Sequence, residues 1–86
     1  MINVGGEKVL PIEIESTLLE IDVVLDVLAY GVTNLITGQS VGVNVVITDG
    51  IQEKIAKKEI RKYCKKNLSN FKVPDRGSVN PTPLGG

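Results

Sequence analysis

The sequence predicts an α+β fold, in which a small mixed or antiparallel sheet of about three strands is covered by two main helices. Apolar side chains recur at helical spacing in residues 12–21 and 52–68, which predicts an amphipathic helix in each range. Residues 40–48 instead alternate valine or isoleucine with small and polar residues, the pattern of a strand with one face in the core. The length of 86 residues is enough for one small domain.

A short strand leads into the first helix. We expect the strand at Glu7 to Leu10 and the helix over residues 12–21, because Pro11 lacks the N–H that would be unpaired at a first helical position. The apolar stripe of this helix, which should face the core, is Ile14, Leu18 and Ile21.

Two longer strands should follow. Residues 23–32 are β-branched and aliphatic on both faces, which favours a largely buried strand, and residues 40–48 should form its neighbour. The connection between them, residues 33–38, carries Leu35 and Ile36. We expect both side chains to pack against the sheet, because apolar residues are unusual in a free loop.

The long helix, residues 52–68, divides into an apolar and a basic face. Its apolar side chains, which should complete the core, are Ala56, Ile60, Tyr63, Cys64 and Leu68. Its basic side chains, which cover much of the remaining surface, are Lys54, Lys57, Lys58, Arg61, Lys62, Lys65 and Lys66.

The domain is expected to span residues 1–74. Residues 75–86 are rich in Gly, Pro and Asn and lack apolar periodicity, so they should form a disordered or foreign tail.

Composition excludes several kinds of site. The chain has no histidine and one cysteine, so it cannot form an internal disulfide and lacks the commonest metal ligand and general base. No apolar run approaches the roughly 20 residues of a membrane span and no secretory signal is visible, so we expect a cytoplasmic protein. We also expect it to be monomeric in isolation.

Charge is unevenly distributed along the chain. The first 50 residues hold seven acids and one base, whereas the last 36 hold three acids and nine bases. That asymmetry could suit a polyanion, but the near absence of aromatic residues argues against nucleic acid.

Several features allow two interpretations when only the residues are considered. Gly5-Gly6 is a phosphate-binding loop or a flexible turn, although it lacks the spacing of the known phosphate-loop motifs. The basic helical face is either solvated or docks a polyanion. Helix-end electrostatics explains Glu7, Glu13 and Glu15 better than acid–base chemistry does. Core packing explains Cys64 better than a reactive thiol does, because no histidine could activate it.

One segment resembles a known family. Ile2-Asn3-Val4-Gly5-Gly6-Glu7-Lys8-Val9, followed by Pro11-x-Glu13-Ile14-Glu15, is similar to the stretch just after the hinge of adenylate-forming ligases, the superfamily of acyl-CoA synthetases and other AMP-binding enzymes. The resemblance covers residues 1–74 and implies the small C-terminal subdomain of such an enzyme. It implies that Gly5, Gly6, Glu7 and Lys8 form a loop at the thiol tunnel, where glycine lets the backbone pass close to the thiol arm of coenzyme A.

A second stretch, Phe71-Lys72-Val73-Pro74, resembles the aromatic-Lys-x-Pro sequence that follows the long helix in many of these ligases. The resemblance implies that Phe71 packs near the adenine of coenzyme A and that Lys72 faces one of its phosphates. The residues alone allow another interpretation, in which Phe71 closes the core.

The C-terminal end departs from the family. Members end in a sequence similar to Thr-Pro-x-Gly-Lys, whose lysine bridges the acyl carboxylate and the ATP phosphates. Thr82-Pro83-Leu84-Gly85 resembles the first part, but Gly86 stands at the place of the lysine, and the strand that usually follows Pro74 is expected to be missing. No residue is therefore assigned a catalytic role. We expect either an expressed fragment, with a foreign tail from Gly77-Ser78 onward, or a natural remnant.

By resemblance, the whole ligase would use ATP, Mg²⁺ and coenzyme A, in a setting such as fatty acid metabolism. This chain would be its mobile lid, inactive in isolation and without a metal or cofactor of its own. Its partners would be an N-terminal large domain and either coenzyme A or a carrier protein. The alternative is a stand-alone interaction module whose basic helix docks an acidic partner such as a carrier protein. We expect neither nucleic acid binding nor a membrane span.

Overall fold

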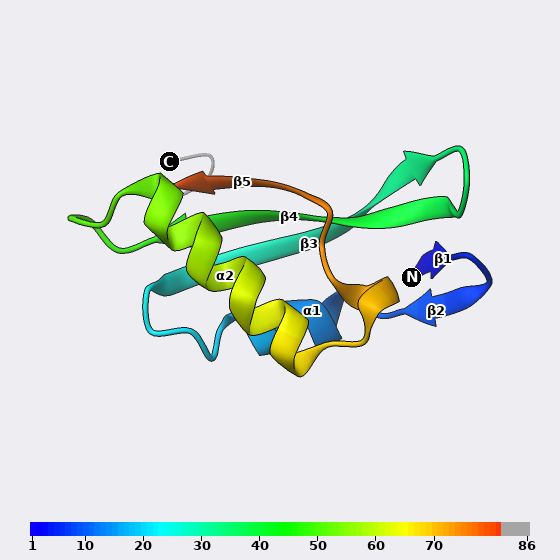
Figure 1. The fold of residues 1–86 in the computed structure, drawn as a ribbon, viewed down its shortest axis with the longest axis horizontal. Coiled ribbons are helices and arrows are strands. Elements are labelled where there is room, and N and C mark those ends of the chain that lie inside the picture. Colours follow the sequence, from blue (N-terminus) through cyan, green and yellow to red (C-terminus); the bar gives the residue numbers. More distant parts are fainter. Residues whose placement is uncertain (82–86) are drawn as a thin grey trace.

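The computed structural model places five strands and two main helices in residues 1–81, which are the residues that it describes (Figure 1). The elements are, in chain order, β1 (Ile2–Val4), β2 (Glu7–Val9), α1 (Pro11–Leu18), β3 (Val24–Asn34), β4 (Gly38–Ile47), α2 (Glu53–Asn67), the short 3₁₀ helix η1 (Asn70–Lys72) and β5 (Arg76–Asn80). The α+β class, the two helices and their approximate bounds agree with the sequence analysis, whereas the sheet has more strands than the three expected.

The sheet is organised around β4. Along one side, β4 pairs antiparallel with β3 from its first residue, opposite Asn34, to its last, opposite Val24. Along the other side, it pairs antiparallel with β1 at Gly38 and parallel with β5 over residues 42–46. β1 also pairs with β2 in a tight hairpin, so the sheet is mixed and runs β2-β1-β4-β3, with β5 beside β4.

The structure differs from the sequence analysis at residues 76–80, which form β5 instead of a disordered tail. The strand that was expected to be missing after Pro74 is therefore present. Its backbone pairing with β4 holds it in place, because its own side chains bury only Val79. A Cβ added at Gly77 would lie 3.0 Å from the carbonyl oxygen of Val43, so glycine allows the two strands to pack closely.

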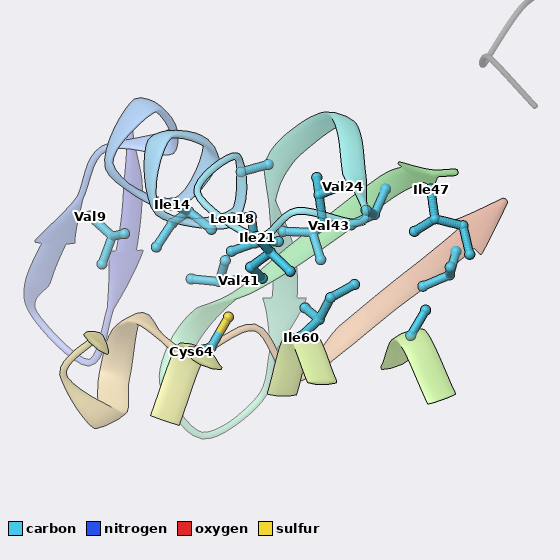
Figure 2. Close-up of a cluster of buried hydrophobic side chains, with 14 of the residues drawn as sticks. Val9, Ile14, Leu18, Ile21, Val24, Val41, Val43, Ile47, Ile60 and Cys64 are labelled. Atoms are coloured by element: carbon cyan, nitrogen blue, oxygen red, sulfur yellow. The ribbon is translucent and has the colours of Figure 1, made fainter. Parts of the chain in front are cut away.

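Both helices cover the same face of the sheet. α1 packs over β3, and α2 packs against α1 and β5. In Figure 2 the labelled side chains of the two helices point toward one another and toward those of β4. The core side chains predicted from periodicity are all buried, namely Ile14, Leu18, Ile21, Val41, Val43, Val45, Ile47, Ala56, Ile60 and Cys64. Tyr63 and Leu68 are partly buried at the edge of this cluster.

Two predictions of burial are wrong. β3 is exposed on one face, with Leu25 and Leu28 more than half exposed, because it lies at the sheet edge and the helices cover only the opposite face. Leu35 and Ile36 project from the β3–β4 hairpin with exposed fractions of 102% and 93%, so neither packs against the sheet. The hairpin carries them beyond the end of the paired strands, where no helix covers them.

Candidate functional site

The β1–β2 hairpin presents the two glycines singled out in the sequence. Gly5 and Gly6 have φ angles of 58° and 90°, a region that L side chains rarely adopt. Two positive φ angles in succession give a tight turn whose twist matches that of the flanking strands. The side chain of Asn3 fixes this turn, because its Oδ1 accepts a hydrogen bond of 2.9 Å from the Gly6 N–H. Glu7 and Lys8 follow in β2 with exposed side chains.

The β1–β2 turn is attached to the neighbouring β3–β4 hairpin. The Gly5 N–H donates to the carbonyl oxygen of Thr37 at 2.8 Å, and the Asn3 N–H donates to Gln39 Oε1 at 2.9 Å. Val4 pairs with Gly38, the first residue of β4. The glycine turn is therefore hydrogen-bonded into the sheet edge rather than being a free loop.

The second set of candidate residues lies in η1. The Nζ of Lys72 is 3.1 Å from Glu13 Oε2, in the first turn of α1, and 5.7 Å from the centre of the Phe71 ring. This Glu13 oxygen is buried and has no hydrogen-bond partner among residues 1–81, so the Lys72 ammonium is the group that compensates its charge. Phe71 is partly buried against the core, as the core-closing interpretation requires, and keeps part of its ring exposed.

The two sets lie at the same end of the molecule. In Figure 1, η1 is beside α1 and the β1–β2 hairpin, and the loop between β4 and α2 is at the opposite end. Leu10 joins β2 directly to α1, whose Glu13 carries the ion pair with Lys72. Residues about sixty positions apart in the chain thus share one surface, a proximity that the sequence alone did not show.

The acidic residues of α1 have tertiary partners that sequence reasoning missed. Glu13 pairs with Lys72, and Glu15 Oε2 accepts a hydrogen bond of 2.9 Å from the Ala29 N–H in β3. Glu15 therefore satisfies a backbone donor of an edge strand and attaches the helix to it. No pattern in the sequence pointed to these roles, since neither partner is near in sequence.

α2 contributes a buried thiol and an exposed basic surface. Cys64 is 1% exposed, and burial raises the pKa of its thiol to about 11, so the thiol is protonated and unreactive near neutrality. This agrees with the prediction of core packing. The basic side chains of α2 are exposed, and within residues 1–81 the Lys72–Glu13 contact is the one ion pair.

A shallow groove of about 360 Å³ runs between α2 and β5. Its basic side chains are Lys57, Arg61 and Arg76, Asp75 is its acid, and its apolar lining includes Ile60 and Cys64. The groove is separate from the glycine turn, whose residues do not line it.

Comparison with known proteins identifies the domain. Residues 13–81 match the family model described as the AMP-binding enzyme C-terminal domain. The chain belongs to this family. It is thus the C-terminal domain of an acyl-CoA synthetase-like adenylate-forming ligase, as the first resemblance implied.

Curated relatives and solved structures agree with this assignment. The chain is 36% identical to 4-hydroxybutyrate–CoA ligase 2 of Metallosphaera sedula over 98% of its own length and 15% of that protein. It is 38% identical to an oxalate–CoA ligase of Arabidopsis thaliana, over 88% of the chain and 14% of the relative. An o-succinylbenzoate CoA synthetase from Bacillus subtilis, solved with its acyl-adenylate intermediate, superposes with a TM-score of 0.81 at 27% identity, over 94% of this chain and 16% of that one.

The AMP-binding C-terminal domain therefore spans about 15% of the length of its curated relatives. Within residues 1–81, neither helix has the length and apolar character needed to cross a membrane. The Thr82-Pro83-Leu84-Gly85 motif and Gly86, at the place of the expected lysine, lie outside the described residues. The assignments of the glycine turn to the thiol tunnel and of Phe71 and Lys72 to coenzyme A stay predictions.

Proposed function

We propose that this domain is the mobile lid of a ligase that activates a carboxylic acid and passes it to a thiol. In the first half-reaction, the acid's carboxylate attacks the α-phosphorus of ATP and pyrophosphate leaves. In the second, the sulfur of coenzyme A or of a carrier protein attacks the acyl carbon and AMP leaves. The observation that carries the proposal is that the glycine turn shares one end of the domain with Phe71 and Lys72.

The shape of the glycine turn supports a role at the thiol tunnel. A Cβ added at Gly6 would have no atom within 4 Å, so the turn presents bare backbone to open space at this residue. Such a narrow edge can approach a thiol arm closely, and the carbonyl oxygens of the turn can accept hydrogen bonds from the amides of that arm. Glu7 and Lys8 would flank the arm as it enters.

The ion pair in η1 supports contact with the nucleotide end of coenzyme A. Glu13 holds the Lys72 ammonium near the Phe71 ring, so the cation has a fixed position before any phosphate arrives. A phosphate at this position would form a charge-assisted hydrogen bond, and the exposed part of Phe71 offers a surface for the adenine.

ATP and Mg²⁺ belong to the proposed large domain. By the family resemblance, the nucleotide pocket lies in that domain and not in the small C-terminal one. We therefore expect no ATP–pyrophosphate exchange by the 86-residue chain with any carboxylic acid, measured by incorporation of labelled pyrophosphate into ATP. Robust exchange would contradict the lid assignment.

The thiol-tunnel role is tested in the full-length ligase by Gly6→Ala, with Gly50→Ala as the matched control. Gly50 has φ 88° and no atom within 4 Å of an added Cβ, as at Gly6, but it lies in the loop between β4 and α2 at the opposite end. Both changes should lower stability by roughly 1–2 kcal/mol through backbone strain. Only Gly6→Ala should slow thioester formation while adenylation continues, and equal effects of the two changes would contradict the role.

The coenzyme A contact is tested by amide-shift titration of the labelled chain. We expect shifts confined to residues 3–8 and 70–74, whereas shifts spread over the lysines of α2 would contradict the site. Lys72→Gln should weaken binding, and Lys66→Gln, which removes an exposed charge from α2, should not. Glu13→Gln leaves the charge of Lys72 in place but removes the carboxylate that positions it. This variant therefore separates the effect of the Lys72 charge from the effect of its position. Binding should also weaken as salt rises, since exposed charges are screened over about 8–10 Å near physiological ionic strength.

A further inference from the structure

The tip of the β3–β4 hairpin carries two adjacent aliphatic residues with almost no protein around them. Leu35 and Ile36 have the highest exposed fractions of any large apolar residues in residues 1–81, 102% and 93%. The surrounding stretch, residues 33–38, contains no charged side chain. Single exposed apolar residues are common, but an adjacent pair presented on a projecting tip favours a site of contact.

Hydrogen bonds within the hairpin brace the tip. Asn34 Oδ1 accepts hydrogen bonds from the N–H groups of Ile36 at 2.9 Å and Thr37 at 3.1 Å. The hydroxyl of Thr37 donates to the carbonyl oxygen of Gln39 at 2.6 Å, and Gly38 closes the loop with φ 87°. Because these bonds already restrain the backbone, docking of the tip should cost little additional conformational entropy.

The tip and the glycine turn form one structural edge. Thr37 follows Ile36 directly and accepts the hydrogen bond from the Gly5 N–H, while Gln39 binds the backbone of Asn3. Any movement that brings Gly5 and Gly6 to a binding surface therefore brings the aliphatic pair to the same surface.

We propose that Leu35 and Ile36 anchor the domain in an apolar recess of the large upstream domain of the same ligase when the glycine turn reaches the thiol tunnel. This inference rests on the proposed function and adds the contact that holds the lid in its thioester-forming position. The domain matches only about 15% of its relatives' length, so in such a ligase most of the polypeptide is available as the partner surface. An uncharged, aliphatic tip suits an apolar recess, whereas the basic face of α2 would suit an acidic surface.

Photocrosslinking in the full-length ligase tests the contact directly. A benzophenone side chain at position 36 should crosslink to the large domain, and more strongly once acyl-adenylate and coenzyme A are bound. The control is position 25, which is 59% exposed but lies at the far end of β3. Crosslinking at 36 no stronger than at 25, or directed to a second copy or a carrier protein, would overturn the proposal.

Half-reaction rates give the second readout. The double variant Leu35→Ser/Ile36→Ser removes two aliphatic side chains that docking would bury. It should slow thioester formation by roughly tenfold or more, while adenylation stays near the parent rate. The matched control, Leu25→Ser/Ile55→Ser, also removes two exposed aliphatics but at the opposite end. If Gly6→Ala slows the thioester step and the tip variant matches its control, the anchor is wrong and the lid role stands. If Gly6→Ala has no selective effect but position 36 crosslinks to the large domain, the tip does contact that domain, but the tunnel role fails and with it the link between this contact and thioester formation.

Discussion

Replacement of Leu18 by alanine tests the packing on which the whole domain depends. Leu18 ends α1, is 0% exposed and lies in the cluster between the two helices and the sheet (Figure 2). The change removes three carbons, which is about 2.4 kcal/mol of transfer free energy at about 0.8 kcal/mol each. The cavity left behind raises the expected loss of unfolding free energy to roughly 3–5 kcal/mol.

This loss is large for so small a protein. At about 0.05–0.15 kcal/mol per residue, the whole domain is stable by roughly 4–13 kcal/mol. A loss of about 3 kcal/mol should lower the melting temperature by roughly 12–24 °C for a domain of this size. The position is critical because α1 packs directly over β3.

The assay is urea unfolding of the purified chain followed by circular dichroism, with Leu19→Ala as the control. Leu19 is the next residue, has helical backbone angles at the C-cap and is 50% exposed, so its truncation should cost less than about 1 kcal/mol. The two variants have the same change in helix propensity and differ chiefly in burial. Equal losses at the two positions would refute the assignment of the buried face of α1.

Three further predictions use the same unfolding assay. Ile60→Ala should cost roughly 2–5 kcal/mol and Ile55→Ala much less, because these residues of α2 are 7% and 53% exposed; a smaller loss at 60 than at 55 would reverse the faces of that helix. Gly42→Ala should destabilise by about 1–3 kcal/mol, since the new Cβ would lie 2.6 Å from a ring carbon of Tyr30, and a gain in stability would show that the ring moves aside freely. Burial raises the pKa of Cys64 to about 11, so the folded state keeps a proton that the unfolded thiol loses near pH 9. Unfolding free energy should therefore fall as pH rises from about 9 to 11, and by less in Cys64→Ala; parallel pH profiles would contradict this.

The sequence by itself determined the buried faces of the two helices and of β4. Helical spacing located Leu18 and Ile60 on buried faces, and strict alternation placed Val41 and Val43 on the inner face of β4. These patterns are local consequences of backbone geometry, so they can be read without knowledge of the partner elements. The motifs around Gly5 and Phe71 also indicated the family correctly.

Only the tertiary structure decided which residues act together. The pairing of Lys72 with Glu13 and the hydrogen bond from Gly5 to Thr37 join segments that are distant in sequence, and no local pattern specifies such pairs. β5 forms because β4 offers unpaired backbone groups, which a sequence poor in apolar residues can still use. Leu35 and Ile36 looked like core residues from composition, but the hairpin places them beyond the reach of either helix. Local periodicity fixes which face of an element is buried, whereas long-range contacts fix which distant segments share one edge.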